Sequence, residues 1–302
     1  MWMWEPIKAA ADEMDYILVA PDGVSDTGNN VSSWHIGGGG NGTAPSGDPV
    51  CDMDRQQRVA CYTTTCDCKE AHPCAWTNCG DDAGFVMALV EYLQGALCID
   101  NVFVAGASNG GMLTWDLASN PTSAQLFQAI APMIGLPHRG YLMGPGAAKG
   151  MPVLLMTGLA DIEIPPGSQD ANTTQSQDGR NFMHYTSAAA ISRVWAQANG
   201  CTANQSIRAS VPALPTMRDV GELGVACTTH CTGDDALQPR QIDCRGPGGH
   251  EVDTTWMLQA MFPFFNQHAA HRPCAGHSTQ LRCASDAPRC AWEGTQCIDV
   301  LV

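Results

Sequence analysis

The chain is short of positive charge. Its 302 residues include 15 Lys and Arg against 30 Asp and Glu, which gives a formal net charge of −15. Proteins that bind nucleic acid neutralise phosphates with clustered Lys and Arg, and the sequence has no such cluster. We therefore expect neither a nucleic acid nor an anionic membrane surface as a partner.

Long apolar runs are also missing. No run approaches the roughly 20 residues of a membrane-spanning helix, so no span is expected. The start, MWMWEPIKAAADEMDYILVAPDG, lacks the basic and apolar regions of a secretory signal peptide. Apolar side chains recur there at helical spacing, and YILVA at 16–20 follows as a buried strand. We expect the given sequence to begin inside a helix of the fold, with an upstream segment missing.

Cysteine, in contrast, is abundant, with 15 residues. All but Cys98 fall into three groups, at 51, 61, 66, 68, 74 and 79, at 201, 227, 231 and 244, and at 274, 283, 290 and 297. In an oxidising compartment such groups form disulfides, whereas in the cytosol they bind metal, for which CDCKEAHPC at 66–74 loosely offers ligands. Disulfides are the favoured interpretation, with Cys98 as a buried free thiol.

Four possible N-glycosylation sites agree with an oxidising compartment. They lie in loop-like sequence, at Asn30, Asn41, Asn172 and Asn204. We therefore expect a secreted, extracellular glycoprotein, whose signal peptide belongs to the missing upstream segment.

Strands and helices alternate along the chain. Expected strands are 16–20, 101–107, 126–135 and 152–158, and expected helices are 81–97, 109–119 and 187–200. The alternation predicts an α/β fold with a mostly parallel, doubly wound sheet and helices on both faces. In the helix at 81–97, Phe85, Leu89, Tyr92 and Leu93 are expected on one apolar face.

Two regions depart from this alternation. Residues 21–81 are irregular and hold a Cys-rich insertion at about 50–80, which disulfides would staple and which could cover a cleft as a lid. The end of the chain, 273–302, is polar and carries four cysteines. We expect residues 1–272 to form the main domain and 273–302 a small Cys-rich tail.

One sequence motif indicates a catalytic serine. In VFVAGASNGGMLTWDLA at 102–118, Ser108 lies between an expected strand and an expected helix. Gly106-Ala107-Ser108-Asn109-Gly110 fits G-x-S-x-G, whose small residues allow the strained turn that exposes a nucleophilic Ser. The backbone N–H of Asn109 is then a candidate oxyanion donor at a helix start. The alternative is a Gly-rich turn or a phosphate loop, although the Gly pattern of a dinucleotide site and the P-loop Lys are missing.

Candidate acid and base residues follow Ser108 in the sequence. They come in the order known for α/β-hydrolases, first the acid and then the His. Asp161 comes three residues after Gly158, past the end of an expected strand, where α/β sheets place their sites. Glu163 is the alternative acid, and Asp161 could instead be a loop acid or a helix cap. His250, in GPGGHEVDTTW at 246–256, is selected as the base by its order and position among nine His.

Together these stretches resemble the extracellular polyhydroxybutyrate depolymerase and feruloyl esterase family of α/β-hydrolases. The matching segments lie over about residues 16–256 and are DDAGFVMALVEYL, CIDNVFVAGASNGGMLTWDLA, FQAIAPMIG, PVLLMTGLADIEIP, MHYTSAAAISRVWAQANGC and GPGGHE. The resemblance implies an α/β-hydrolase fold for 1–272 and a carboxylic ester hydrolase without metal or cofactor. It makes Ser108 the nucleophile, Asp161 the orienting acid and His250 the general base. The expected substrate is a polyhydroxyalkanoate-type polyester or a feruloyl ester of plant walls.

The sequence departs from the family in two places. Family members carry an apolar strand ending in His-Gly, which supplies the second oxyanion donor, and the given sequence starts after that point. The family has an aromatic residue and Pro directly after the base, whereas in this sequence His250 is followed by Glu251, Val252 and Asp253. This difference affects the expected substrate pocket and not the three predicted catalytic residues. A catalytically impaired, hydrolase-like binding protein therefore stays open as an alternative, as does a Cys-rich metal-binding protein.

Overall fold

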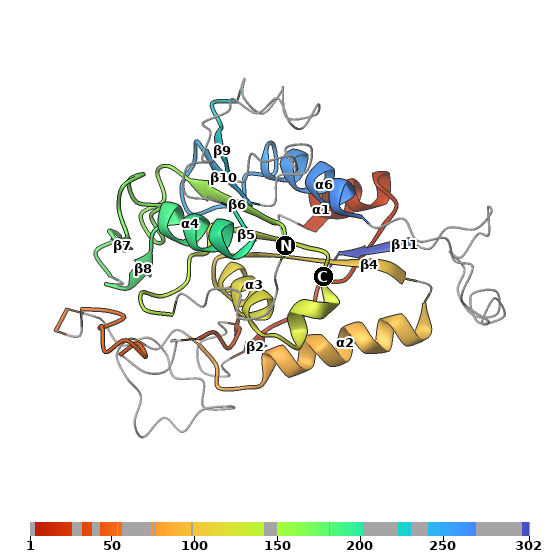
Figure 1. Cartoon of the computed structure of the whole chain (residues 1–302), viewed down its shortest axis with the longest axis horizontal. Coiled ribbons are helices and arrows are strands. Elements are labelled where there is room, and N and C mark those ends of the chain that lie inside the picture. The colour runs from red at the N-terminus through yellow and green to blue at the C-terminus, as the bar shows by residue number, and fades with distance from the viewer. Residues whose placement is uncertain are drawn as a thin grey trace.

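A seven-stranded sheet forms the centre of the molecule (Figure 1). The computed structural model describes residues 4–25, 32–37, 43–52, 54–55, 74, 77–97, 99–141, 150–180, 182–201, 223–230, 241–269 and 298–301. The strands, in the order in which they pair, are β1 (Tyr16–Leu18), β11 (Ile298–Leu301), β4 (Ile99–Ala107), β5 (Ala129–Met133), β6 (Val153–Gly158), β10 (Gln241–Gly246) and β9 (Ala226–His230). All neighbours run parallel except β9, which is antiparallel to β10. The predicted mostly parallel α/β sheet is confirmed.

Helices cover both faces of this sheet (Figure 1). On one face lie α2 (Asp82–Ala96), α3 (Asn109–Ser119) and α4 (Ala188–Ala198), and on the other lie α1 (Trp4–Glu13) and α6 (Met257–His268). Each face has its own core, and successive side chains of a strand enter different cores because they point to opposite faces. On β4, Val102 and Val104 belong to the core under α3, while Phe103 packs with Phe265 of α6.

Small elements lie outside the main sheet. A short 3-10 helix (Ser123–Leu126) links α3 to β5. Two antiparallel pairs are formed by β2 (Val24–Ser25) with β3 (Ser32–Ser33), and by β7 (Thr173–Gln175) with β8 (His184–Thr186).

α2 turns Asp82, Val86 and Val90 toward the core. Val86 and Val90 are buried, whereas Phe85 is 47% exposed and Tyr92 is 72% exposed. The helix has two apolar stripes, and the buried carboxylate of Asp82 selects between them, because its Oδ2 accepts the backbone N–H of His35 and the side-chain amide of Asn78. Val86 and Val90 follow Asp82 at intervals of four residues and therefore face inward with it. Of the four residues expected on one apolar face, Phe85 and Tyr92 are exposed, whereas Leu89 and Leu93 are partly buried.

The end of the chain contributes a central strand. Leu301 of β11 is in register with Leu18 of β1 on one side and with Phe103 of β4 on the other. The sequence predicts the tail as a separate unit and the central strand as part of a missing upstream segment. In this structure β11 holds the position between β1 and β4. Residues 270–297 lie outside the described part, so the domain boundary at 272 stays a prediction.

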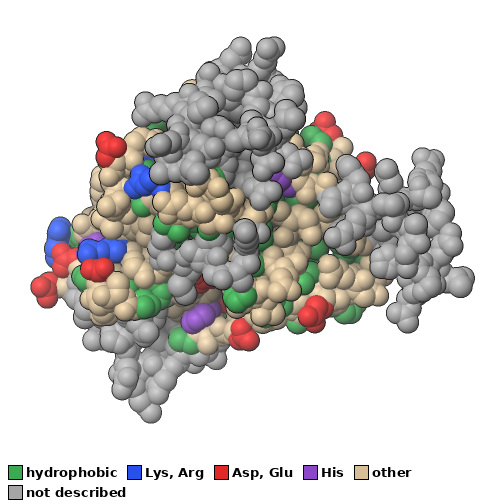
Figure 2. All heavy atoms as spheres, viewed as in Figure 1, with side chains coloured by type: hydrophobic (Ala, Val, Ile, Leu, Met, Phe, Trp, Pro, Cys, Tyr) green, Lys and Arg blue, Asp and Glu red, His purple; other side chains and the backbone are tan. Residues whose placement is uncertain are grey.

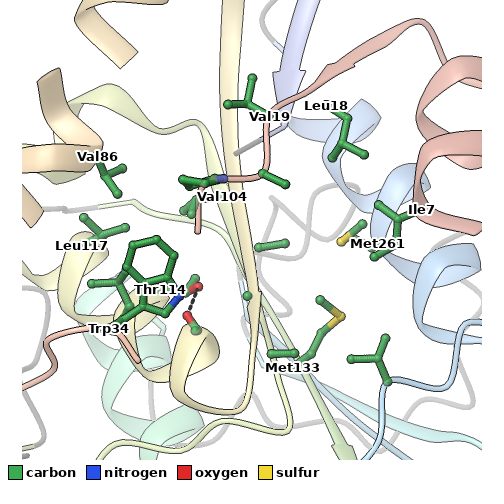
Figure 3. A pocket seen from close by; sticks show the side chains of 18 residues that line it. Ile7, Leu18, Val19, Trp34, Val86, Val104, Thr114, Leu117, Met133 and Met261 are labelled. Carbon is green, nitrogen blue, oxygen red and sulfur yellow. Dashed lines mark hydrogen bonds between the residues drawn. The ribbon is translucent and has the colours of Figure 1, made fainter. Parts of the chain in front are cut away.

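A cavity of about 250 Å³ passes through the sheet beside β4 (Figure 3). Past Leu301, no described residue lies between β1 and the carboxyl end of β4, and the cavity fills this gap. Its walls come from both cores, with Val86 and Leu117 from one and Leu18 and Met261 from the other, as Figure 3 shows on either side of β4. A closed sheet would separate these side chains, so within the described residues the carboxyl ends of β1 and β4 are not paired across the cavity, which reaches Gly106 and Ala107.

Disulfide bonds cross-link the described parts of the Cys-rich regions. Cys51 is bonded to Cys74, and Cys227 of β9 is bonded to Cys244 of β10, opposite it in the sheet. Cys79 and Cys201 are also disulfide-bonded. The predicted disulfides are confirmed at these six positions, which include the last Cys of the CDCKEAHPC stretch. Cys98 and the remaining cysteines lie outside the described residues.

The surface agrees with the acidic composition. On the face shown in Figure 2, acidic side chains are scattered, and Lys and Arg gather at the end where Figure 1 places β7 and β8. This view shows no extended basic surface among the described side chains. Within the described ranges, no helix is long and apolar enough to cross a membrane.

Candidate active site

Ser108 occupies a strained turn between β4 and α3. Its φ of 55° and ψ of −121° are rare for a residue with a side chain. A backbone of this kind costs about 1–3 kcal/mol and persists only where its surroundings impose it. Here the Ser108 N–H donates to the carbonyl of Met133 at 3.0 Å, and the Ser108 carbonyl accepts the N–H of Met112 at 3.0 Å. The predicted strand–turn–helix context of Ser108 is confirmed.

Glycines let the backbone approach closely around this turn. A Cβ on Gly106 would lie 2.3 Å from the carbonyl oxygen of Gly110, and one on Gly111 would lie 2.8 Å from that of Met133. A Cβ on Gly110 would meet nothing nearer than 3.7 Å. The close packing that the motif predicts therefore applies to Gly106 and to Gly111, one residue beyond the motif, and not to Gly110.

Three predicted side chains meet at the carboxyl edge of the sheet. The Oγ of Ser108 is 2.8 Å from Nε2 of His250, and Nδ1 of His250 is 2.8 Å from Oδ2 of Asp161. Because Nδ1 faces a carboxylate, its proton is held there, and Nε2 is left to accept the hydroxyl proton of Ser108. Residues that are 53 and 89 positions apart in the sequence thus form one hydrogen-bonded chain.

Asp161 is placed by the loop that follows β6. The side chain is buried, and its Oδ1 accepts the backbone N–H groups of Glu163 at 2.9 Å and Ile164 at 2.8 Å. These two bonds fix the carboxylate and leave Oδ2 directed at His250. Asp161 is therefore both the capping acid of a loop and the partner of His250, two roles that the sequence presents as alternatives.

The loop that carries His250 is held against the Asp161 loop. The N–H of Ala160 donates to the carbonyl of Gly248 at 2.9 Å. A Cβ on Gly158 would lie 2.4 Å from the carbonyl of Gly249, so the two loops meet where Gly158 has no side chain. Because β6 and β10 are neighbouring parallel strands, their carboxyl ends bring these loops together.

Glu163, the alternative acid, approaches the other side of the imidazole. Its Oε2 is 3.7 Å from Nε2 of His250, and its side chain is 51% exposed. It does not reach Nδ1, where Asp161 is bound. The geometry therefore makes Asp161, and not Glu163, the residue that orients His250.

Charge around His250 alters its proton affinity. Burial of the imidazole lowers the pKa of His250, but the hydrogen bond and charge of Asp161, with smaller contributions from Glu163 and Glu251, outweigh it, and the net pKa is raised. The imidazolium form of His250 is thus favoured by its neighbours.

Asn109, the predicted oxyanion donor, is the first residue of α3. Its side chain is engaged with a neighbouring segment, because Oδ1 accepts the N–H of Trp34 at 2.6 Å and Nδ2 donates to the Trp34 carbonyl at 3.3 Å. Its backbone N–H belongs to the first turn of the helix, where anions are favoured. The oxyanion role of Asn109 stays a prediction.

A small pocket opens beside the hydrogen-bonded chain. It has a volume of about 40 Å³ and is lined by Ser108, Asn109, Met112, His138, Glu163, Ile164, Met183, Tyr185 and His250. Apart from the residues already described, the lining is mainly apolar, and His138 is the exception. His138 is not among the site residues predicted from the sequence, although its place shortly after the predicted strand at 126–135 is a signal that points to it.

Other histidines lie elsewhere in the fold. His184 is in β8, His230 is in β9, and His268 is the last residue of α6, and none of the three lines the pocket. Among the described residues, no group of three or more His, Cys, Asp or Glu side chains could hold a metal ion.

Comparisons with protein-family models, with curated proteins and with solved structures find no match for the chain.

Proposed function

We propose that this chain is a serine ester hydrolase with the α/β-hydrolase fold. The observation that carries the proposal is the continuous hydrogen-bonded chain from Ser108 Oγ through His250 to Asp161. Its support is threefold: the order Ser, acid, His along the sequence, the strained backbone of Ser108, and the position of all three at the carboxyl edge of a mostly parallel sheet.

The first half of the reaction forms an acyl-enzyme. Nε2 of His250 takes the hydroxyl proton as Ser108 Oγ attacks the carbonyl carbon of the ester. The resulting tetrahedral intermediate carries a negative oxygen, for which the backbone N–H of Asn109 is the proposed donor. When the intermediate collapses, the bond to the alkoxy oxygen breaks, and this oxygen leaves as an alcohol with the proton from His250.

The second half releases the acid. His250 takes a proton from water, whose oxygen attacks the acyl carbon, and Ser108 Oγ then leaves with that proton. Asp161 holds the imidazole in one orientation and tautomer and stabilises its charged form in both halves.

The disulfides support an oxidising location. Six described cysteines are disulfide-bonded, which is typical of a secreted protein and rare in a cytosolic one. We therefore propose an extracellular enzyme that acts on a carboxylic ester, which can be part of a polymer.

A second candidate function is binding without hydrolysis. The observation that favours it is the cavity through the sheet, which reaches Gly106, Ala107 and Gly110 on both sides of Ser108. Among the described residues, no strand pairs with the carboxyl end of β4 on the side of the cavity, so a second oxyanion donor would have to come from elsewhere, and in other enzymes one such donor is worth about 10²–10³ in rate.

Hydrolysis of p-nitrophenyl acetate separates the two candidates. The wild-type chain is expected to release p-nitrophenol, and the Ser108→Ala variant is expected to have at most a trace of this activity with an unchanged melting temperature. A Ser123→Ala variant, at a buried Ser far from His250 in the sequence, serves as a control for the loss of a hydroxyl group. Equal rates for wild-type protein and Ser108→Ala would overturn the esterase proposal.

A further inference from the structure

Ser176 contacts the loop that carries Asp161. It directly follows β7 and is buried, and its Oγ donates to the backbone carbonyl of Glu163 at 2.7 Å. The next residue, Gln177, donates its backbone N–H to the carbonyl of Ile162 at 2.6 Å. Two consecutive carbonyls of the Asp161 loop are therefore held from the end of β7.

The same two peptide units also hold the carboxylate of Asp161. The N–H of Glu163, which shares a peptide plane with the Ile162 carbonyl, donates to Asp161 Oδ1 at 2.9 Å. The N–H of Ile164, which shares a plane with the Glu163 carbonyl, donates to the same oxygen at 2.8 Å. Because the N–H and the C=O of a trans peptide point in opposite directions, each unit faces the carboxylate with its N–H and the end of β7 with its carbonyl.

This arrangement lengthens the chain of hydrogen bonds at the site. The chain runs from Ser108 through His250 to Asp161. Beyond Asp161, the peptide unit of residues 163–164 leads to the hydroxyl of Ser176. Hydrogen bonds in such a chain polarise one another, so a donor on the carbonyl of this unit makes its N–H a stronger partner for the carboxylate. Loss of that donor would weaken one of the two bonds that fix Asp161.

Tyr185 holds the hydroxyl of Ser176 from its other side. The two hydroxyl groups are hydrogen-bonded to each other. The proton of Ser176 is already bound to a carbonyl, which cannot donate, so Tyr185 is the donor in this pair. Burial raises the pKa of Tyr185, so its hydroxyl keeps the proton that it donates. The hydroxyl of Ser176 is therefore directed at the Glu163 carbonyl.

We propose that Ser176 is a positioning residue, whose hydroxyl keeps the carboxylate of Asp161 directed at His250 through the peptide unit of residues 163–164. This inference rests on the proposed ester hydrolysis and adds a residue that the sequence pattern does not identify. Ser176 is not among the described residues that line the small pocket, so its effect on the reaction is indirect. It is expected to change the rate of the chemical steps and not the binding of the ester.

Ser176→Ala tests the proposal, with p-nitrophenyl acetate as the substrate. The variant removes the donor to the Glu163 carbonyl, and kcat is expected to fall about tenfold, which is the effect of about one net hydrogen bond. KM is expected to stay within about twofold of the wild-type value, because the pocket is unchanged. Tyr185 loses its partner in this variant, so the melting temperature is measured too, and all rates are compared well below it.

A matched pair at the same position isolates the effect of the hydroxyl group. Ser176→Thr and Ser176→Val introduce the same branched shape, but only Thr can donate to the Glu163 carbonyl. The kcat of Ser176→Thr is expected to be about tenfold higher than that of Ser176→Val. This pair also carries the test if Ser176→Ala does not fold.

Ser187→Ala provides a structural control. Ser187 is buried and caps α4, since its Oγ donates to the carbonyl of Ala171 and accepts the N–H of Ala190 at 3.2 Å. Its loss is expected to lower the melting temperature and to leave kcat and KM unchanged, because neither of these two bonds leads to Asp161. A hydroxyl group with only a structural role would behave in this way.

The outcomes distinguish this inference from the proposed function. A wild-type kcat in folded Ser176→Ala, or equal kcat values in Ser176→Thr and Ser176→Val, would refute the positioning role and leave ester hydrolysis standing. A change confined to KM would assign Ser176 to substrate binding and would refute the positioning role as well. Absence of hydrolysis by folded wild-type protein would overturn the proposed function, and the inference with it.

Discussion

Asp161 and Glu163 approach the imidazole of His250 from opposite sides. Asp161 Oδ2 lies 2.8 Å from Nδ1, while Glu163 Oε2 lies 3.7 Å from Nε2, the nitrogen that faces Ser108. The backbone N–H of Glu163 is in turn bound to Asp161 Oδ1. Two acids that are two positions apart in the sequence therefore have different places in the site, and under the proposed function one would orient the base and the other would add charge beside it.

Replacing the two acids by their amides is expected to separate these parts. Asp161→Asn should lower kcat/KM for p-nitrophenyl acetate by about 10⁴-fold, the loss typical of an orienting acid in a Ser-His-Asp triad, because the amide favours the wrong tautomer of His250. Glu163→Gln should change it by at most about fivefold, because an exposed ion pair is worth about 0–1 kcal/mol. A severe loss in Glu163→Gln with a mild one in Asp161→Asn would assign the orienting acid to Glu163.

The pH profile is expected to report the raised pKa of His250. His250 accepts a proton only when it is neutral, so kcat/KM rises with pH through its pKa, at a pH above the ordinary histidine value of about 6.5. Glu163 is one of the charges that raise this pKa, so Glu163→Gln should move the rise to lower pH. The measurement is kcat/KM between about pH 5 and about pH 9.

Asp170→Asn provides the control for this shift, because Asp170 lies in the same loop region and is not among the groups that act on His250. It should leave the midpoint where the wild-type protein has it. A midpoint that moves to higher pH in Glu163→Gln would contradict the electrostatic account of His250.

Glycine substitutions at the turn are expected to differ sharply. Gly106→Ala places a methyl group 2.3 Å from the Gly110 carbonyl, and overpacking of this kind costs about 1–3 kcal/mol. Gly110→Ala places it in ordinary van der Waals contact with Trp34, in the first turn of α3, and Ala in place of Gly at such a compatible position stabilises by about 0.4–1 kcal/mol. Thermal unfolding should show a lower melting temperature for Gly106→Ala and an equal or higher one for Gly110→Ala. The reverse order would show that the backbone around Ser108 is packed differently.

The sequence predicts those parts of the molecule that depend on local pattern. The bounds of α3 match the predicted helix at 109–119, and β6 matches the predicted strand at 152–158 to within one residue. The order of Ser108, Asp161 and His250 was enough to select three side chains that meet in space, because parallel strands bring their carboxyl ends to one edge.

Features that depend on competition between distant segments were not predictable. No local pattern shows that Ile298–Leu301 lies between β1 and β4, because that pairing joins the two ends of the chain. The apolar pattern of α2 contains two stripes, and the choice between them depends on hydrogen bonds of Asp82 with His35 and Asn78. His138 is a single residue whose burial in the wall of the pocket, stacked on Tyr185, follows from its neighbours in space.

The most direct test of the account is covalent labelling of Ser108. A fluorophosphonate probe reacts with a serine hydroxyl that a neighbouring base activates, and peptide mass spectrometry locates the label. The account predicts a label on Ser108 that is lost in His250→Ala, although Ser108 itself is retained there. Folded wild-type protein that leaves Ser108 unlabelled would contradict an activated serine and favour the binding protein with an incomplete site.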